Sequence, residues 1–384
     1  MLFVFLSATL LVPAAAAQSV GGRGTPQEEG FVFQTVAEVP TTPVKDQART
    51  GTCWSFATTS FIETELLRMG NGPLDLSEMY FVRMTYPQKV QNYVRLHGNT
   101  TLGQGSLAGD VIRAVRLYGA VPEALYSGRQ YGKERHDHAE LHAVLKGAVD
   151  AVVKTRGGLS PVWPEAVEGI LDAYLGEIPE TFVYNGKTYT PRSFAGELGI
   201  RPDDYVELTS FTHHPFDSWF ALEIPDNWAR NKSYNVPLEE LMGVIDRAVE
   251  RGFSVDWDGD VSERSFCHDK GVAIWPLNPW DERSSEERGQ LCDVPEPEVR
   301  VTQELRQRSF DNYTSSDDHL MHIVGIAKDQ HGTKYYVTKN SWGETGAKDG
   351  FVYMSESYVR AKTMSIVVHR DALPQELARR ALRN

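Results

Sequence analysis

Cys53 is the first residue of the chain whose surroundings suggest chemistry. It lies six residues after Gln47 and directly before Trp54, at the start of a stretch with helical periodicity. Apolar residues recur every three or four positions from Trp54 to Met69, which predicts a helix with one buried face. A helix N-terminus favours a thiolate, and the Gln47 amide could donate a hydrogen bond to a developing oxyanion. These are parts of an acyl-transfer site, although a lone cysteine is more often a buried structural residue.

Partners for the thiol are expected near the C-terminus. His322 opens an apolar run to Ala327, and a second β-rich run over 335–338 leads to Asn340. The polar turn between them predicts an antiparallel hairpin. Without a bulge, this hairpin places His322 opposite Asn340, with both side chains on one face. Asn340 would then orient one imidazole nitrogen of His322 and leave the other for the thiol, while Trp342 would shield their hydrogen bond from water.

These segments resemble the papain-like cysteine peptidases. QARTGTCWSFA is similar to their active-site segment, and MHIVGIA and KNSWGETGAKDGF resemble their histidine and asparagine segments. Gln47, Cys53, His322 and Asn340 correspond to the oxyanion-hole glutamine, the nucleophile, the base and the orienting asparagine, in that order. The resemblance implies a Cys53 thiolate that rests as an ion pair with His322, and a thioester acyl-enzyme that water hydrolyses.

Two departures point to the branch of bleomycin hydrolase and aminopeptidase C. Thr50 stands where secreted papain-like enzymes carry a structural cysteine, and His322 follows Cys53 by 269 positions, against about 130–150 in those enzymes. YGAVPEALY, the His214-Pro215 segment, YNVP, SVDWDGDV and VVHRDALP resemble this branch. The branch implies an α+β, papain-like two-subdomain fold, with a helical and a β-rich subdomain and a large, mainly helical insertion at about 126–205.

The resemblance also assigns substrate contacts. Gly105 and Ser106 match a glycine pair that lies along the substrate backbone, with Ser106 a departure, and glycine there lets a peptide come close. Trp54 and Trp342 are expected to contact substrate as well. In the branch, a C-terminal arm enters the cleft and makes the enzymes aminopeptidases. Residues 375–384 predict only a short basic helix, so an aminopeptidase is the default expectation and an endopeptidase the alternative. An acyl-transferase and an inactive binding homologue are further alternatives.

The composition is that of an ordinary globular protein, with 384 residues, 41% hydrophobic and 24% charged. Residues 1–17 predict a signal peptide, hence an exported protein, periplasmic or secreted, without membrane insertion. Residues 18–40 predict a loose arm, and residues 41–384 the peptidase domain. The net charge of −13 argues against nucleic acid as a partner. A peptide or protein substrate is the expected partner, and the branch resemblance makes a homohexamer possible.

The expected chemistry needs neither a metal nor an organic cofactor. His136, His138 and His142 could bind a metal, but solvent-facing histidines on a polar helix are the favoured interpretation. The acidic stretch 256–260 lacks the residue order of an EF-hand calcium loop and falls where the family has a core strand. Cys267 and Cys292 could pair in an exported protein, or both could be free and buried.

Overall fold

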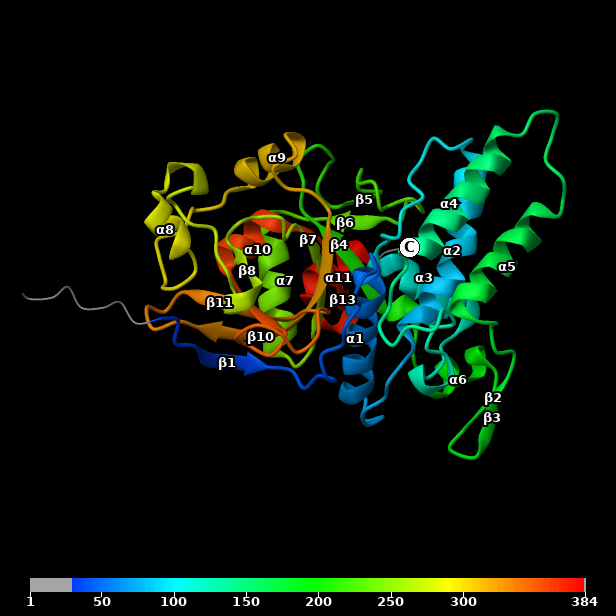
Figure 1. The fold of residues 1–384 in the computed structure, drawn as a ribbon. Coiled ribbons are helices and arrows are strands. Elements are labelled where there is room, and N and C mark those ends of the chain that lie inside the picture. The colour runs from blue at the N-terminus through cyan, green and yellow to red at the C-terminus, as the bar shows by residue number, and fades with distance from the viewer. Residues whose placement is uncertain (1–29, 383–384) are drawn as a thin grey trace, which may run out of the picture.

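The computed structural model describes residues 30–382, so the predicted signal peptide, residues 1–17, and most of the predicted arm lie outside the described residues. Within them the chain forms a helical subdomain and a β-rich subdomain with helix α1 between the two (Figure 1). The expected α+β, two-subdomain papain-like architecture is therefore confirmed. No helix of residues 30–382 is long and apolar enough to cross a bilayer.

The β-rich subdomain is built on one mixed sheet. Its strands follow the order β5-β6-β4-β13-β7-β10-β11-β12-β9-β8, and β1 pairs with β10. Their bounds are β1 Gln34–Glu38, β4 Tyr205–Thr209, β5 Ser218–Phe220, β6 Ser233–Asn235, β7 Val255–Gly259, β8 Phe266–Cys267, β9 Val272–Ala273, β10 His319–Lys328, β11 Lys334–Lys339, β12 Phe351–Ser355 and β13 Thr363–His369. Strand β10 is central because it contacts β1, β7 and β11.

Five helices accompany this sheet. They are α7 Leu238–Glu250, α8 Ser285–Gly289, α9 Gln303–Asp311, α10 Glu356–Lys362 and α11 Gln375–Ala381. Helix α7 covers one face of the sheet, and its apolar side chains join those of β7, β10 and β13 in a hydrophobic core. Short 3₁₀ turns complete the chain at η1 Glu123–Leu125, η2 Pro202–Asp204, η3 His268–Lys270, η4 Trp280–Glu282 and η5 Arg370–Ala372.

The helical subdomain has its own core. It consists of α1 Cys53–Arg68, α2 Glu78–Arg95, α3 Ala108–Tyr118, α4 Ala139–Lys154, α5 Trp163–Leu175 and α6 Pro191–Glu197, with a small hairpin of β2 Phe182–Tyr184 and β3 Lys187–Tyr189. Helices α4 to α6 and the hairpin fall within residues 126–205, where a mainly helical insertion is predicted. Their apolar side chains pack with those of α1 to α3 in a second hydrophobic core.

Helix α1 differs from its expectation. Every residue from Cys53 to Leu66 is buried, whereas the sequence pattern predicts one buried face. The reason is its position, since α1 packs against α2 and α3 on one side and against β7 and β10 on the other. Polar positions of the helix are therefore buried in the contact between the subdomains.

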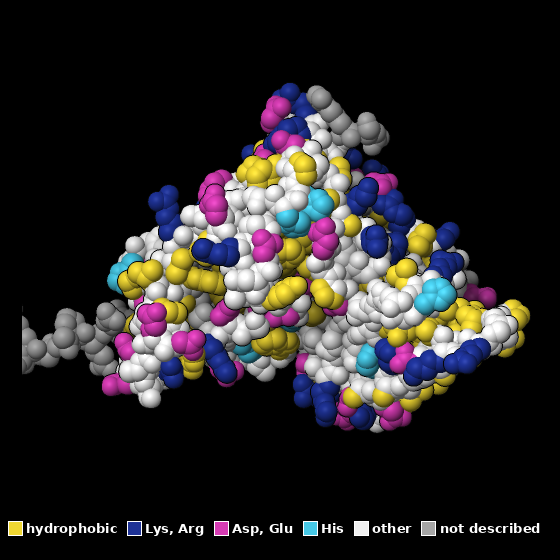
Figure 2. All heavy atoms as spheres, turned by 90° about the horizontal axis from the view of Figure 1, so that it is seen from above, with side chains coloured by type: hydrophobic (Ala, Val, Ile, Leu, Met, Phe, Trp, Pro, Cys, Tyr) yellow, Lys and Arg dark blue, Asp and Glu magenta, His cyan; other side chains and the backbone are white. Residues whose placement is uncertain are grey.

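Figure 2 shows acidic and basic side chains interspersed over the face of the molecule seen from above.

Candidate active site

Cys53 is the first residue of α1 and the free cysteine of the chain. No side chain caps this helix start; the Ser55 and Phe56 N–H groups bond the Thr52 carbonyl instead. Burial raises the pKa of the Cys53 thiol to about 12, although hydrogen bonds from the backbone of Leu320 and Trp54 favour the thiolate. The helix start alone therefore does not produce a resting thiolate, because removal from water outweighs these donors.

His319, rather than His322, is the histidine that contacts Asn340. Its Nε2 donates to Asn340 Oδ1 at 2.7 Å, which leaves Nδ1 as the nitrogen available to a thiol. The next residue, Leu320, supplies the backbone hydrogen bond to Cys53, so the start of β10 adjoins the start of α1. Burial lowers the pKa of His319 to about 4, even though the bond to Asn340 favours the charged ring. Burial therefore disfavours the charged form of both the thiol and the imidazole, and so opposes the expected resting ion pair.

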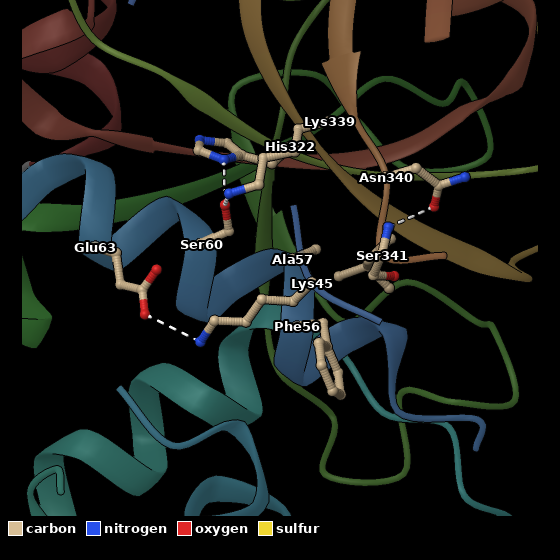
Figure 3. A pocket seen from close by; sticks show the side chains of 10 residues that line it. Lys45, Phe56, Ala57, Ser60, Glu63, His322, Lys339, Asn340 and Ser341 are labelled. Atoms are coloured by element: carbon tan, nitrogen blue, oxygen red, sulfur yellow. Dashed lines mark hydrogen bonds and ion pairs between the residues drawn. The ribbon is translucent and has the colours of Figure 1, made fainter. Parts of the chain in front are cut away.

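The expected pairing of His322 with Asn340 is wrong. His322 is fully buried, and its Nδ1 is 2.9 Å from Ser60 Oγ on α1. Figure 3 shows His322 above Ser60, whereas the Asn340 amide points away from that pocket. Burial lowers the pKa of His322 well below its ordinary value, with a further contribution from the charge of Lys339. His322 is thus a neutral ring on the side of β10 that faces α1.

A bulge explains the error. The hairpin of β10 and β11 is confirmed, but its register shifts between Ile323 and Gly325, so that His322 lies opposite Lys339. Asn340 then follows the last residue of β11, beyond the paired positions. Because side chains alternate along a strand, positions 319 and 322 project to opposite faces. His319 was missed because it precedes the apolar run, yet like Asn340 it flanks the open end of the hairpin. That shared position was the signal available in the sequence.

The Gln47 side chain is buried and held by hydrogen bonds at both atoms of its amide. Its Oε1 accepts a hydrogen bond from Ser341 Oγ at 2.6 Å, and its Nε2 donates to the Thr50 carbonyl at 2.7 Å. The Asn340 side chain accepts the N–H of Ser341 in turn. The Gln47 amide is thereby fixed to the same segment that carries Asn340, and its Nε2 retains a second hydrogen for another acceptor.

The two tryptophans occupy different environments. Trp54 is completely buried in the helical core and donates from Nε1 to the Gln104 carbonyl, so its side chain is not available to a substrate as expected. Trp342 is half-buried, and its ring lies 4.9 Å from that of His319 between centroids. It also contacts His268 at 4.8 Å. Trp342 therefore covers the pair of His319 and Asn340, as predicted for the histidine–asparagine bond.

The predicted substrate loop is partly filled by the protein itself. Ser106 is buried, donates to Asp110 and accepts from Trp228 Nε1, so its side chain does not face a substrate as expected. Gly105 is half-buried, but a Cβ built there would lie 1.8 Å from Oδ2 of Asp226. Glycine at 105 therefore makes room for the Asp226 carboxylate.

The histidines of the sequence motif are not arranged as expected. His136 and His138 precede α4 and are buried, and both ring nitrogens of His138 lack hydrogen-bond partners among the described residues. A different group has metal-ligand geometry, since the ligand atoms of His213, His214 and Glu223 all lie within 4.8 Å of one another. Glu223 accepts from both rings, at 3.0 Å and 2.7 Å. Two imidazoles and a carboxylate would suit zinc.

Two remaining sequence questions are resolved locally. Cys267 and Cys292 form a disulfide, with Cα atoms 6.4 Å apart. Residues Val255–Gly259 form the buried strand β7, as predicted for the acidic stretch. The side chains of Asp256 and Asp258 alternate with Trp257, whose ring lies in the core under α7. The two carboxyl groups therefore face α1.

The sequence is similar to known cysteine peptidases and aminopeptidases. The model of the "Peptidase C1-like family" matches residues 181–383, and that of "Papain family cysteine protease" matches residues 33–91. Aminopeptidase E of Lactobacillus helveticus is 23% identical over 89% of this chain and 84% of the relative. Aminopeptidase C of Lactococcus lactis subsp. cremoris is 22% identical over 87% of this chain and 82% of the relative.

Two further similarities extend the same result. "Cysteine proteinase 1, mitochondrial" of Saccharomyces cerevisiae is 22% identical over 92% of this chain and 80% of the relative. The crystal structure of PepW from Lactobacillus rhamnosis HN001 superposes with a TM-score of 0.71, at 18% identity, over 90% of this chain and 84% of PepW. The chain therefore belongs to the peptidase C1-like family of cysteine peptidases, in the branch of bleomycin hydrolase and aminopeptidase C.

Proposed function

We propose that this protein hydrolyses peptide bonds through a thioester on Cys53, with His319 as the general base. The observation that carries the proposal is the 2.7 Å bond from His319 Nε2 to Asn340 Oδ1, on the strand whose next residue contacts the thiol. Asn340 holds the ring so that Nδ1 can take the thiol proton and later protonate the leaving amine. Gln47 Nε2 and the Cys53 backbone N–H stabilise the oxyanion. Water then hydrolyses the thioester.

We propose an aminopeptidase, in agreement with the printed names of two relatives. An endopeptidase remains the alternative because α11 is anchored at the β5 edge of the sheet. Ala381 accepts from Trp219 Nε1, and Arg380 pairs with Asp217 and Glu240 at the β5 side of the sheet. Export is likewise a proposal, supported by the disulfide, because such bonds persist in oxidising compartments. A homohexamer stays a prediction.

The test combines thiol chemistry with product analysis. Cys53→Ala should abolish turnover of a peptide library at an unchanged melting temperature, and iodoacetamide should label Cys53 as the free thiol. Mass spectrometry of the products from free and N-acetylated peptides distinguishes the modes of cleavage. Release of single residues from free N-termini supports an aminopeptidase, and internal cuts in acetylated peptides support an endopeptidase. Turnover retained by Cys53→Ala refutes the mechanism, while partitioning of product to an added amine rather than water would indicate acyl transfer.

A further inference from the structure

Three carboxyl groups gather beside Cys53 on the side of Gly105. Asp258 lies on β7, Asp317 precedes β10, and Asp226 lies in the loop after β5. Asp258 is the cross-strand neighbour of Leu320, whose backbone bonds the Cys53 thiol. The charges of Asp317 and Asp258 both raise the pKa of Cys53, after the larger effect of burial. We call Asp226, Asp258 and Asp317 the carboxyl cluster.

Two members of the carboxyl cluster lack the donors that a buried carboxylate needs. Asp258 is only 2% exposed, and neither of its oxygens receives a hydrogen bond from an N–H or hydroxyl group of the described residues. Oδ2 of Asp317 is equally without a donor. The two carboxyl groups adjoin each other and can bond only by sharing a proton. Burial and their mutual repulsion raise the pKa of Asp258 well above its ordinary value, and burial with the charge of Asp226 raises that of Asp317 to about 7.

The third member reaches the half-buried surface. The Asp226 carboxylate lies against Gly105, and the charge of Lys89 favours its ionised form. Gly105 is held in place by its neighbours, because Trp54 Nε1 bonds the Gln104 carbonyl and Lys89 Nζ bonds that of Gly105. Asp226 is half-buried and its charge acts on Asp317, so it links the buried pair to the surface beside Gly105.

The cationic charge near the carboxyl cluster is small. The charge of Lys89 interacts with the carboxyl groups of Asp226, Asp317 and Asp110. Its buried ammonium also donates a hydrogen bond to the Gly105 carbonyl. One ammonium thus faces three carboxyl groups. Buried carboxylates without donors or counter-charges are costly, and an incoming cation relieves that cost.

We propose that the carboxyl cluster binds a cationic group of the substrate next to Cys53. The group is an ammonium or guanidinium ion, supplied either by the free N-terminus of a peptide or by a lysine or arginine side chain. This inference rests on the proposed peptidase function. When Asp258 and Asp317 share one proton, the pair carries a single negative charge, and a bound cation would offset the effect of that charge on the thiol. Recognition of the substrate would thereby favour transfer of the Cys53 proton to His319.

The first experiment measures kcat/KM for matched peptides with the full chain and with Asp226→Asn and Asp317→Asn. The peptides have a free or an acetylated N-terminus, and lysine or norleucine at each position before the cut. Loss of a charged hydrogen bond should lower kcat/KM for the cationic peptide roughly 10- to 100-fold in both variants, while neutral peptides are cut at the wild-type rate or faster. Glu223→Gln, which removes an acid from the same loop at the His213 and His214 rings, is the matched control and should change neither.

The two peptide comparisons, free against acetylated N-terminus and lysine against norleucine, distinguish the two sources of the cation. Sensitivity to acetylation alone assigns the N-terminal ammonium, and sensitivity to norleucine alone assigns a side chain. Wild-type turnover that depends on neither, or variants that lose cationic and neutral peptides equally, overturns the proposal.

The second experiment is independent of turnover. Iodoacetamide alkylation of Cys53 is followed at fixed pH and ionic strength, with n-butylammonium or with sodium as the added cation. The amine should accelerate alkylation in the wild type. Without the amine, Cys53 of Asp317→Asn should be alkylated faster than Cys53 of the wild type. Addition of the amine should accelerate alkylation less in this variant than in the wild type. Equal rates with both cations in the wild type contradict the inference. Amine acceleration in a protein that cuts no peptide would refute the proposed function and leave the cation site standing.

Discussion

The two histidines of strand β10 lie three residues apart and have different surroundings. His319 is at the strand's first position, bonded to Asn340 and stacked near Trp342. His322 faces α1, bonded to Ser60 and opposite Asp256 on β7. Both rings are buried and both are held neutral by burial. The difference shows that being a buried histidine is not enough to act as the base. The proposed role depends on which face of β10 carries the ring, because only one face adjoins the Cys53 thiol.

The largest expected effect comes from replacing each histidine. His319→Ala should lower kcat roughly 10²- to 10⁴-fold, because general acid–base catalysis is lost. His322→Ala should leave kcat of the folded protein nearly unchanged and lower the melting temperature, because Ser60 loses a buried partner. Steady-state kinetics and thermal unfolding on the same samples check both. If His322→Ala has the larger loss of kcat, the assignment of the base is wrong.

Adjacent residues at the end of β11 sharpen the comparison. Asn340→Ala should lower kcat by roughly 10- to 100-fold, because it removes one hydrogen bond to a ring that becomes charged during turnover. Lys339→Met should leave kcat unchanged, since the Lys339 ammonium bonds Ser60 and the Thr42 carbonyl on the other side of the strand. A pH profile of kcat tests this, because Asn340→Ala should also weaken protonation of His319. Equal losses of kcat in Asn340→Ala and Lys339→Met would show that the two faces of the strand do not differ in their effect on turnover.

The smallest expected effect is a pH dependence of stability on the His322 side. Burial raises the pKa of Asp256 from 3.8 to about 8, and the charge of Glu207 adds to the shift. The native state therefore holds a proton that the unfolded chain releases, and stability falls as pH rises through that range, by up to about 1.4 kcal/mol per pH unit.

Asp256→Asn should remove this slope. Urea unfolding between pH 6.5 and 8 is the measurement, because the buried His322 destabilises the fold as pH falls below 6.5 and so contributes little in that window. The variant should be more stable than the wild type at pH 8 and should approach it near pH 4. A wild-type and variant difference that is constant with pH would mean that Asp256 is ionised in the native state.

Much of the site follows from the sequence, and the failures have a local cause. Cys53 at a helix start, Gln47 upstream of it and Asn340 after a hairpin are placed as predicted. The partner histidine was misassigned because one bulge shifts the strand register, and a shift of one residue exchanges the faces of every side chain beyond it. Trp54 was misassigned because its position on the buried face of α1 places its ring in the helical core, where its Nε1 bonds the Gln104 carbonyl instead of facing a substrate. The carboxyl cluster joins residues from three distant segments, which no local pattern brings together.

The disulfide lies on the same chain segment as His268, which is a neighbour of the proposed pair of His319 and Asn340. Cys267 immediately precedes His268, whose ring packs on Trp342 and lies 3.4 Å from the Asn340 amide nitrogen. A thiol reductant, which would protect Cys53 from oxidation during purification, acts on this bridge as well. Reductant concentration therefore has two opposing effects on this protein, because the agent that keeps Cys53 reduced also opens the bridge next to His268, whose ring packs on the Trp342 cover of His319.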